Sequence, residues 1–281
     1  MSTHKSFEKH IDVAETGLTA VDLLSEATEL SKQVIKQAMT KGAVWLTRDK
    51  NTQRLRRARR TLKKDDIVHL YYNAEILASI PTKALLIADE GDYSVWYKPY
   101  GLLSQGSKWS DHCTITRFAS QHLAPERPAF IVHRLDRAAT GLILVAHTKK
   151  ATAALTELFQ KRRMNKQYQA IVQGKFPTSP KTLTFDTPID DRVAISHVQL
   201  IEYSEKRDCS LVRVDIETGR KHQIRRHLSE AGYPILGDRL YGIEASPTVD
   251  LQLTAVLLSF TCPLTQELRC YELDKDLRPQ L

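Results

Sequence analysis

The stretch His133–Gly141, HRLDRAATG, places a single carboxylate between two arginines in a turn. Short apolar runs flank it, FIV at 130–132 and LILVA at 142–146, and both are typical of buried strands. We therefore expect Asp136 on a loop held by rigid elements, an arrangement common at catalytic sites. Nearby positive charge favours the ionised carboxylate, which suits nucleophilic work better than proton donation. The alternative interpretation is a structural ion pair that closes the turn.

The composition is that of a globular protein with one large domain or two smaller ones: 281 residues, 42% hydrophobic and 26% charged. No apolar run approaches the length of a membrane span, and the N-terminal MSTHKSFEKHIDVAE lacks the apolar core of a secretory signal. We therefore expect a cytoplasmic protein. The cysteines form no C-x-x-C pair, which argues against a zinc site and a disulfide framework. They are Cys113, Cys209, Cys262 and Cys270.

The formal charge of +8 indicates a polyanionic partner, and its distribution is more informative than its size. In the run 54–64, RLRRARRTLKK, seven of eleven residues are basic. Phosphate binding with counterion release is the natural use of such density, although a solvated charged face is the alternative. The residues predicted to bind RNA here are Arg54, Arg56, Arg57, Arg59 and Arg60.

The patterning predicts a small α+β domain over 1–80, with its folded part at about 16–73. Helical spacing begins near Val21 and again near Ser31, and Gly42 follows where a C-cap belongs. Strands are predicted on either side of the basic run, at 43–46 and 67–72. Residues 74–88 are predicted to form a linker and a leading strand.

A second domain is predicted over 81–281, where strand patterns dominate and few full crossover helices separate them. This favours an α+β fold with a mostly antiparallel mixed sheet and flanking helices. The predicted strands are 93–97, 131–132, 142–146, 168–172, 198–203, 211–216 and 257–261, and the predicted helices are 113–123, 149–162 and 221–230.

Three further segments accompany the Asp136 loop. Lys98-Pro99-Tyr100-Gly101 is typical of a structural turn that ends a strand. Tyr168, near the start of a predicted strand, offers a flat face for stacking on a base, or it is a core tyrosine. The segment 218–228, TGRKHQIRRHL, begins a helix dense in positive charge, which contains Arg225. The alternative there is a basic surface helix that touches only phosphates.

These four segments, in this order, strongly resemble the RluA-type family of RNA pseudouridine synthases over residues 89–281. Residues 16–73 resemble the small RNA-binding domain that carries the αL motif of ribosomal proteins. The first resemblance implies the pseudouridine synthase core, with Asp136 as the catalytic aspartate, Tyr168 stacked on the target base and Arg225 paired with the aspartate. It also implies that Arg134 enters the RNA. The other predicted RNA contacts are Arg137, Arg220 and Lys221.

The implied reaction converts uridine to pseudouridine without a cofactor or a metal ion. Asp136 would either attack ribose carbon 1′ or abstract a proton from carbon 2′, and Tyr168 could accept or relay the proton from carbon 5. A target in structured RNA must first be swung out of its stack. We expect ribosomal rather than transfer RNA as substrate, no DNA or membrane partner, and a monomer. The competing hypotheses are a non-catalytic RNA-binding or ribosome-assembly protein and, with less support, a glycosidase or nuclease.

Three positions depart from the family pattern. Ala139 stands where the family usually has threonine before Ser-Gly, so one hydroxyl is lost, while Thr140 keeps one at the next position. Thr254 stands where the family often has histidine, and Cys262 is another such replacement. The Ala139 departure motivates the non-catalytic alternative.

Overall fold

The computed structural model describes residues 6–243 and 248–281, and these divide into two compact units. Unit 1 is made of residues 6–81 and 105–118, and unit 2 of residues 82–104 and 119–281. The sequence predicted one division near residue 80. The structure instead groups 105–118 with unit 1, so the chain passes between the units three times.

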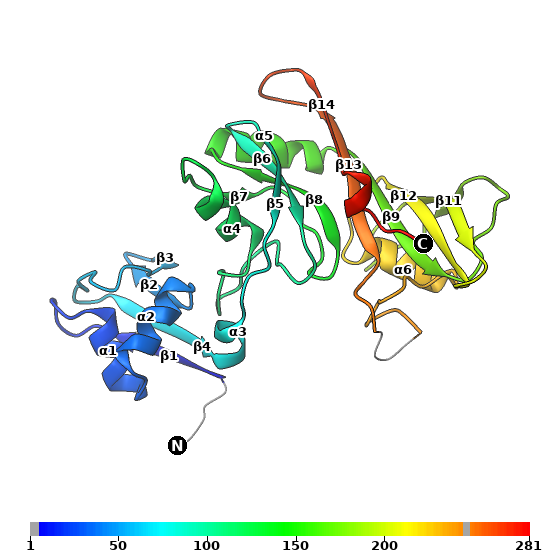
Figure 1. The fold of residues 1–281 in the computed structure, drawn as a ribbon. Helices are drawn as coiled ribbons and strands as arrows, with labels where there is room; N and C mark the ends of the chain where they lie inside the picture. Colours follow the sequence, from blue (N-terminus) through cyan, green and yellow to red (C-terminus); the bar gives the residue numbers. More distant parts are fainter. Residues whose placement is uncertain (1–5, 244–247) are drawn as a thin grey trace. The chain divides into compact units, whose positions relative to one another are not determined.

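Unit 1 is a four-stranded antiparallel sheet in the order β1-β4-β2-β3 with short helices (Figure 1). Its elements are β1 (Ser6–Asp12), α1 (Ala20–Thr28), α2 (Lys32–Thr40), β2 (Val44–Arg48), β3 (Asn51–Arg54), β4 (Ile67–Asn73) and α3 (Ala74–Ala78). Strand β1 was not predicted, because its sequence SFEKHID is mostly charged. It forms because Phe7 and Ile11, on one face of the strand, pack against the core of the unit.

Side chains cap the helices of unit 1 and fix where they begin. The backbone N–H of Asp22 donates to the Thr19 hydroxyl, and that of Val34 donates to the Ser31 hydroxyl. Gly42, with a φ of +83°, follows α2 where glycine was expected. The helices bury Leu24 and Ile35 completely against the sheet.

Unit 2 is built on a ten-stranded mixed sheet (Figure 1). The order is β10-β11-β12-β9-β13-β8-β6-β5, with β14 on β13 and β7 on β8. The strands are β5 (Leu85–Asp89), β6 (Tyr93–Lys98), β7 (Phe130–Ile131), β8 (Thr140–Ala146), β9 (Asn165–Gln173), β10 (Leu183–Phe185), β11 (Ser196–Ser204), β12 (Cys209–Ile216), β13 (Leu253–Thr261) and β14 (Leu268–Glu272). The helices are α4 (Ile115–His122), which begins in unit 1, α5 (Lys149–Gln160) and α6 (Gln223–Glu230), with a 3₁₀ turn η1 (Lys275–Leu277).

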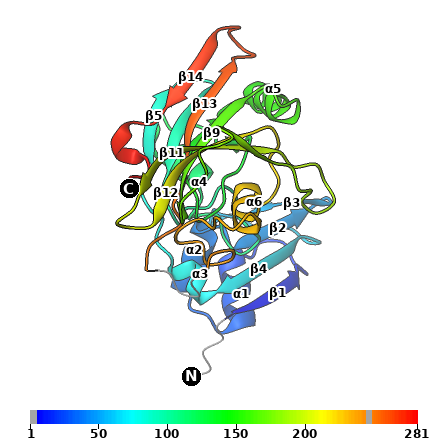
Figure 2. The same cartoon turned by 90° about the vertical axis from the view of Figure 1, so that its right-hand side faces the viewer.

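All strand pairs of unit 2 are antiparallel except β8 with β13, which confirms the predicted α+β fold. Figure 2 shows β13 running beside β9, with which it pairs along one edge. Helix α5 packs against β8 and helix α6 against β11. The turn that carries Asp136 therefore lies between β7 and the central strand β8.

Candidate active site

The Asp136 loop is held on both sides of the carboxylate by the segment that follows β6. The backbone N–H of Leu135 donates to the Ser104 hydroxyl at 3.0 Å, and that hydroxyl donates to the Leu135 carbonyl at 2.7 Å. On the other side, the Gly101 N–H donates to the Arg137 carbonyl at 3.0 Å. These bonds fix the backbone on either side of Asp136, so its carboxylate is presented from a rigid turn.

Lys98 is fully buried beneath this loop. Its ammonium donates to the carbonyls of Leu102, Pro99 and Arg137 at 2.9, 3.2 and 3.3 Å. Burial lowers the pKa of Lys98 to about 7, and the negative charge of Asp136 acts in the opposite direction. The Lys-Pro-x-Gly turn was predicted to be structural, and it is. That Lys98 links the segment after β6 to the Asp136 loop was not predicted from the sequence.

Arg225, on α6, meets Asp136 as the family resemblance implied. Arg225 Nη1 lies 3.3 Å from Asp136 Oδ2. The same guanidinium donates to both oxygens of Asp238, Nε to Oδ2 at 2.8 Å and Nη2 to Oδ1 at 2.7 Å. Burial opposes charge on Arg225, but the two carboxylates outweigh it and raise its pKa. Arg225 therefore stays a cation with a fixed direction, and Asp136 retains 26% exposure of its side chain.

Asp238 is one of the functional residues that the sequence analysis missed. Its side chain is 1% exposed, and its Oδ1 also accepts from the backbone N–H groups of Leu240 and Tyr241. These bonds and Arg225 lower its pKa in spite of burial. Gly237 makes the turn possible, since a Cβ there would lie 2.2 Å from the Asp250 carbonyl oxygen.

His222 and Tyr241 complete the ring of polar groups around Asp136, and neither was singled out from the sequence. His222 Nε2 lies 3.8 Å from Asp136 Oδ1, and its Nδ1 lies 3.0 Å from the Tyr241 hydroxyl. The Arg225 guanidinium stands over the Tyr241 ring at 5.1 Å. The two oxygens of Asp136 thus face different partners, arginine on one side and histidine on the other.

The start of α6 is built by the side chain of Gln223. Its Oε1 accepts from the Thr218 hydroxyl at 2.7 Å and from the Arg220 N–H at 3.0 Å, and its Nε2 donates to the Ile195 carbonyl. This network replaces an ordinary N-cap, because residue 222 itself makes no capping bond. It ties the first turn of α6 to Thr218, just after β12, and to Ile195, just before β11.

Tyr168 lies on β9, half-buried, in the apolar cluster that also contains Ala139 and Tyr100. Burial, and then the charge of Asp136, raise the pKa of its hydroxyl. A neutral phenol next to the carboxylate suits a stacking role. The structure therefore brings Asp136, Tyr168 and Arg225 together in unit 2.

The basic residues predicted around this site differ in their exposure and in their hydrogen bonds. Arg134, Arg137 and Lys221 are exposed, and Arg137 Nε also donates to the Gly101 carbonyl at 3.4 Å. Arg220 is half-buried, and its Nε donates to the Val193 carbonyl at 2.9 Å. That bond gives Arg220 a structural role in addition to any contact with RNA.

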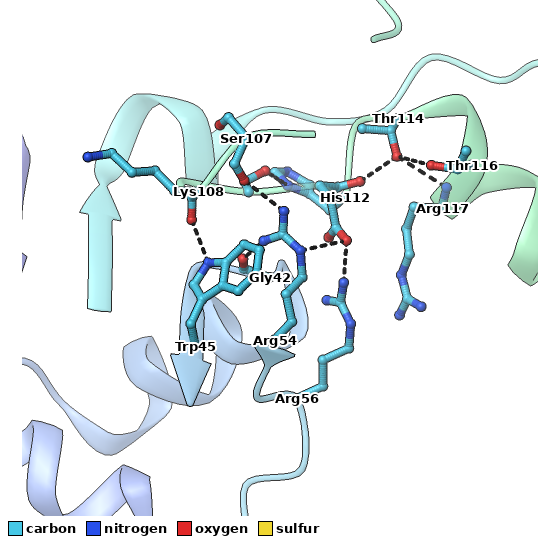
Figure 3. Close-up of polar contacts among 12 residues, drawn as sticks. Gly42, Trp45, Arg54, Arg56, Ser107, Lys108, His112, Thr114, Thr116 and Arg117 are labelled. Carbon is cyan, nitrogen blue, oxygen red and sulfur yellow. Dashed lines mark hydrogen bonds and ion pairs between the residues drawn. The ribbon is translucent and has the colours of Figure 1, made fainter. Parts of the chain in front are cut away.

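In unit 1 the arginine run divides into two groups. Arg54 Nε lies 3.1 Å from Asp111 Oδ2, and Arg56 Nη2 donates to the same oxygen. Arg54 also donates to the Ser107 carbonyl at 2.7 Å and stacks on Trp45 at 4.2 Å. Figure 3 shows both guanidiniums directed at the segment that carries Ser107. These contacts explain why 105–118 belongs to unit 1.

The other predicted RNA contacts of the run have a different environment. Arg57 and Arg59 are exposed, and Arg60 is half-buried, with a charge that helps to lower the pKa of Asp66. The density of arginines in the sequence could not distinguish these residues from Arg54 and Arg56. The partner that does so, Asp111, lies 55 residues beyond Arg56 in the chain.

The three departures from the family pattern are accommodated in the core. Ala139 is 3% exposed within an apolar cluster, so the missing hydroxyl leaves no unpaired group. The Thr140 and Thr254 hydroxyls lie 2.8 Å apart across the parallel pair β8 and β13. Cys262 is buried in a second apolar cluster. None of the three contacts the Asp136 carboxylate directly.

Comparison with known proteins agrees with this geometry. A family model described as RNA pseudouridylate synthase matches residues 92–230. An uncharacterized RNA pseudouridine synthase of Aquifex aeolicus is 28% identical over 242 residues, 78% of this chain and 74% of that protein. The ribosomal large subunit pseudouridine synthase D of Pseudomonas aeruginosa is 32% identical over 207 residues, 64% of this chain and 63% of its own length. The match therefore spans less than two thirds of the Pseudomonas protein.

A solved structure shares the fold. Human RNA pseudouridylate synthase domain containing 1 superposes with a TM-score of 0.58 at 21% identity, covering 70% of this chain and 86% of that one. Residues 92–230 match the RNA pseudouridylate synthase family, whose members are isomerases that act on RNA. This confirms the family and the enzyme class that the sequence predicted.

Residues 6–243 and 248–281 contain neither a candidate membrane-spanning helix nor a candidate metal site. No helix there is long and apolar enough to cross a membrane, and those residues form no group of three or more metal-ligating side chains.

Proposed function

We propose that this protein isomerises uridine to pseudouridine in structured RNA, with Asp136 as its catalytic aspartate. The observation that carries the proposal is the pairing of a half-exposed Asp136 with Arg225, a buried arginine whose direction is fixed by Asp238. A cation held in this way fixes the position of the carboxylate that would face the ribose.

The reaction breaks the bond from ribose carbon 1′ to ring nitrogen 1 and forms a bond from carbon 1′ to ring carbon 5. Asp136 either attacks carbon 1′ or takes a proton from carbon 2′. Tyr168 receives the flipped base on its ring, and the exposed Arg134 enters the gap left in the RNA. One carboxylate suffices because the base stays bound and is its own acceptor.

We further propose ribosomal RNA as the substrate and unit 1 as an RNA-binding domain of the αL type. The first proposal is supported by relatives named as ribosomal large subunit synthases, and the second by the exposed Arg57 and Arg59. Transfer RNA is the alternative substrate.

The reaction is tested by release of tritium from RNA labelled at uracil carbon 5, with wild type and Asp136→Asn. Wild type is expected to release tritium, and the variant to release none while binding RNA with nearly the same affinity. Absence of release by wild type from unmodified transcripts of both RNA classes, with tight binding, would instead support a non-catalytic RNA-binding protein.

The substrate class is tested by offering unmodified large-subunit ribosomal RNA and unmodified transfer RNA at equal uridine concentration. Faster release from the ribosomal transcript is expected. Release confined to transfer RNA would overturn the choice of substrate and leave the reaction standing.

A further inference from the structure

The proposed reaction needs an acceptor for one proton. When carbon 1′ joins carbon 5, the hydrogen on carbon 5 must leave, and its bonding electrons restore the double bond of the uracil ring. Since carbon 5 is then bonded to the carbon that Asp136 serves, the acceptor must lie close to Asp136. This inference rests on the proposed function and assigns that step.

The other titratable groups around Asp136 are poorly suited to the task. Tyr168 remains a neutral phenol because its pKa is raised, and a neutral phenol is a very weak base. Lys98 is completely buried, and its ammonium is bonded to three carbonyls. Asp136 itself has one oxygen paired with Arg225, and its carboxylate is already assigned to carbon 1′ or carbon 2′ of the ribose.

His222 is placed differently. Its Nε2 lies 3.8 Å from Asp136 Oδ1, beyond hydrogen-bond distance, and its side chain is 16% exposed. In the tautomer in which Nδ1–H donates to the Tyr241 hydroxyl, Nε2 carries a free electron pair on the side of Asp136. The residue adopts a φ of +56°, a left-handed conformation that is uncommon outside glycine and is frequent at functional sites.

Two cations and two carboxylates act on the charge of His222. Burial lowers the pKa of His222, the neighbouring cations Arg225 and Lys221 lower it further, and Asp136 and Asp238 act in the opposite direction. The imidazole is therefore neutral near pH 7 and able to take a proton. Once protonated, it stands beside the Asp136 carboxylate, which stabilises the imidazolium.

We propose that His222 Nε2 accepts the proton that leaves carbon 5. The C–H electrons return to the ring, nitrogen 1 keeps the electron pair of the broken bond and takes up a proton, and the isomerisation is balanced without a co-reactant. Because His222 is partly exposed, its proton exchanges with water, so label from carbon 5 appears in solvent.

The test is a single-turnover comparison of wild type with His222→Gly on RNA carrying hydrogen or deuterium at uracil carbon 5. Glycine adopts a φ of +56° without strain, so the variant removes the imidazole and keeps the backbone. We expect a rate loss of roughly 100-fold, the usual scale for a general base. We also expect a larger deuterium isotope effect than in wild type and recovery of rate on addition of imidazole.

Two further variants make the result decisive. His222→Asn, which also tolerates a positive φ, should behave like glycine without recovery. Glu230→Gln, an exposed position on the same helix, should match wild type. An unchanged isotope effect with no recovery by imidazole would overturn the role of His222 while wild type still forms pseudouridine. If wild type forms none, the proposed function fails, and the inference fails with it.

Discussion

Asp238 determines where the Arg225 guanidinium lies, since it takes two of the nitrogens of that group and leaves Nη1 for Asp136. Its Oδ1 accepts from the backbone N–H groups of Leu240 and Tyr241, so its position is set by the turn that begins at Gly237. The direction of the cation at Asp136 is thus set by Asp238.

Asp238→Asn is expected to slow the reaction while leaving RNA binding largely intact. The variant weakens a charged hydrogen bond worth about 2 kcal/mol, which corresponds to roughly a thirtyfold loss of rate. Single-turnover rates measure this, with Asp250→Asn, an exposed position, as the control. A wild-type rate in Asp238→Asn would show that Arg225 needs no orienting partner.

His133 makes the stability of unit 2 dependent on pH. Its Nε2 accepts from the Leu144 N–H at 2.9 Å, and burial lowers its pKa from 6.5 to about 3. Between these two values the unfolded chain binds a proton that the folded chain refuses, so stability falls as the pH falls. In thermal melts at pH 7 and pH 4.5, His133→Gln should lose less Tm than wild type does. An equal loss in both proteins would assign the acid sensitivity to other groups.

At the scale of elements, the parallel pair β8 and β13 depends on Gly141. A Cβ at this position would lie 2.2 Å from the Ala255 carbonyl oxygen, and its φ is +109°. The close approach of the two strands brings Thr140 and Thr254 together next to the loop of Asp136. Close packing of β8 against β13 therefore requires glycine at position 141. The Asp136 turn, which precedes this glycine, is held in place by the same strands.

Gly141→Ala is expected to destabilise the protein by about 3 kcal/mol, through overpacking and backbone strain together. The matched control is Gly174→Ala, which has a φ of +78° but open space around the new methyl group, so it should cost about 1 kcal/mol. Denaturant unfolding at neutral pH measures both. Equal losses would show that strain alone matters at position 141.

The sequence predicted elements well where a pattern is local. Helical spacing and end signals predicted 149–162 and 221–230, close to the observed Lys149–Gln160 and Gln223–Glu230. It failed where the cause is a distant partner. Strand β1 is rich in polar residues and forms because it pairs with β4 and packs Phe7 and Ile11 on the core, and Lys98 donates to the Arg137 carbonyl, 39 residues away.

The same limit applies to the candidate site. The family resemblance supplied Asp136, Tyr168 and Arg225, and the structure brings them together. Asp238 and His222 could have been suspected from their nearness to Arg225 in the sequence, but their direction toward it depends on positive-φ residues in two separate turns. Such an orientation depends on the folded backbone, so the spacing of residues in the sequence does not predict it.

At the scale of the whole molecule, the charge of +8 is shared between residues that face solvent and residues that hold the protein together. Replacing Arg57 and Arg59 with glutamine should weaken RNA binding and flatten its salt dependence by up to about two phosphate contacts. Replacing Arg54 and Arg56 instead should lower the melting temperature of the protein, because the half-buried Asp111 is left without its two arginine partners.

Filter binding at several salt concentrations and thermal melts separate these two outcomes. An exposed lysine, Lys181, provides the control, since its replacement with glutamine should change neither property. If the Arg54 and Arg56 variant retained wild-type stability and lost the salt dependence, both arginines would have to be counted as RNA ligands.

The passage of the chain through unit 1 and back has a consequence for how such a protein can be shortened or recombined. A polypeptide that started at Thr82 would still carry Gln105–Phe118, now without Trp45 and the two arginines that hold it. The N-terminal region is thus not a domain that can be removed or exchanged by cutting the chain at one position. A deletion or gene fusion that treats it as one would leave residues 105–118 without these contacts, directly upstream of the segment that leads to the Asp136 turn.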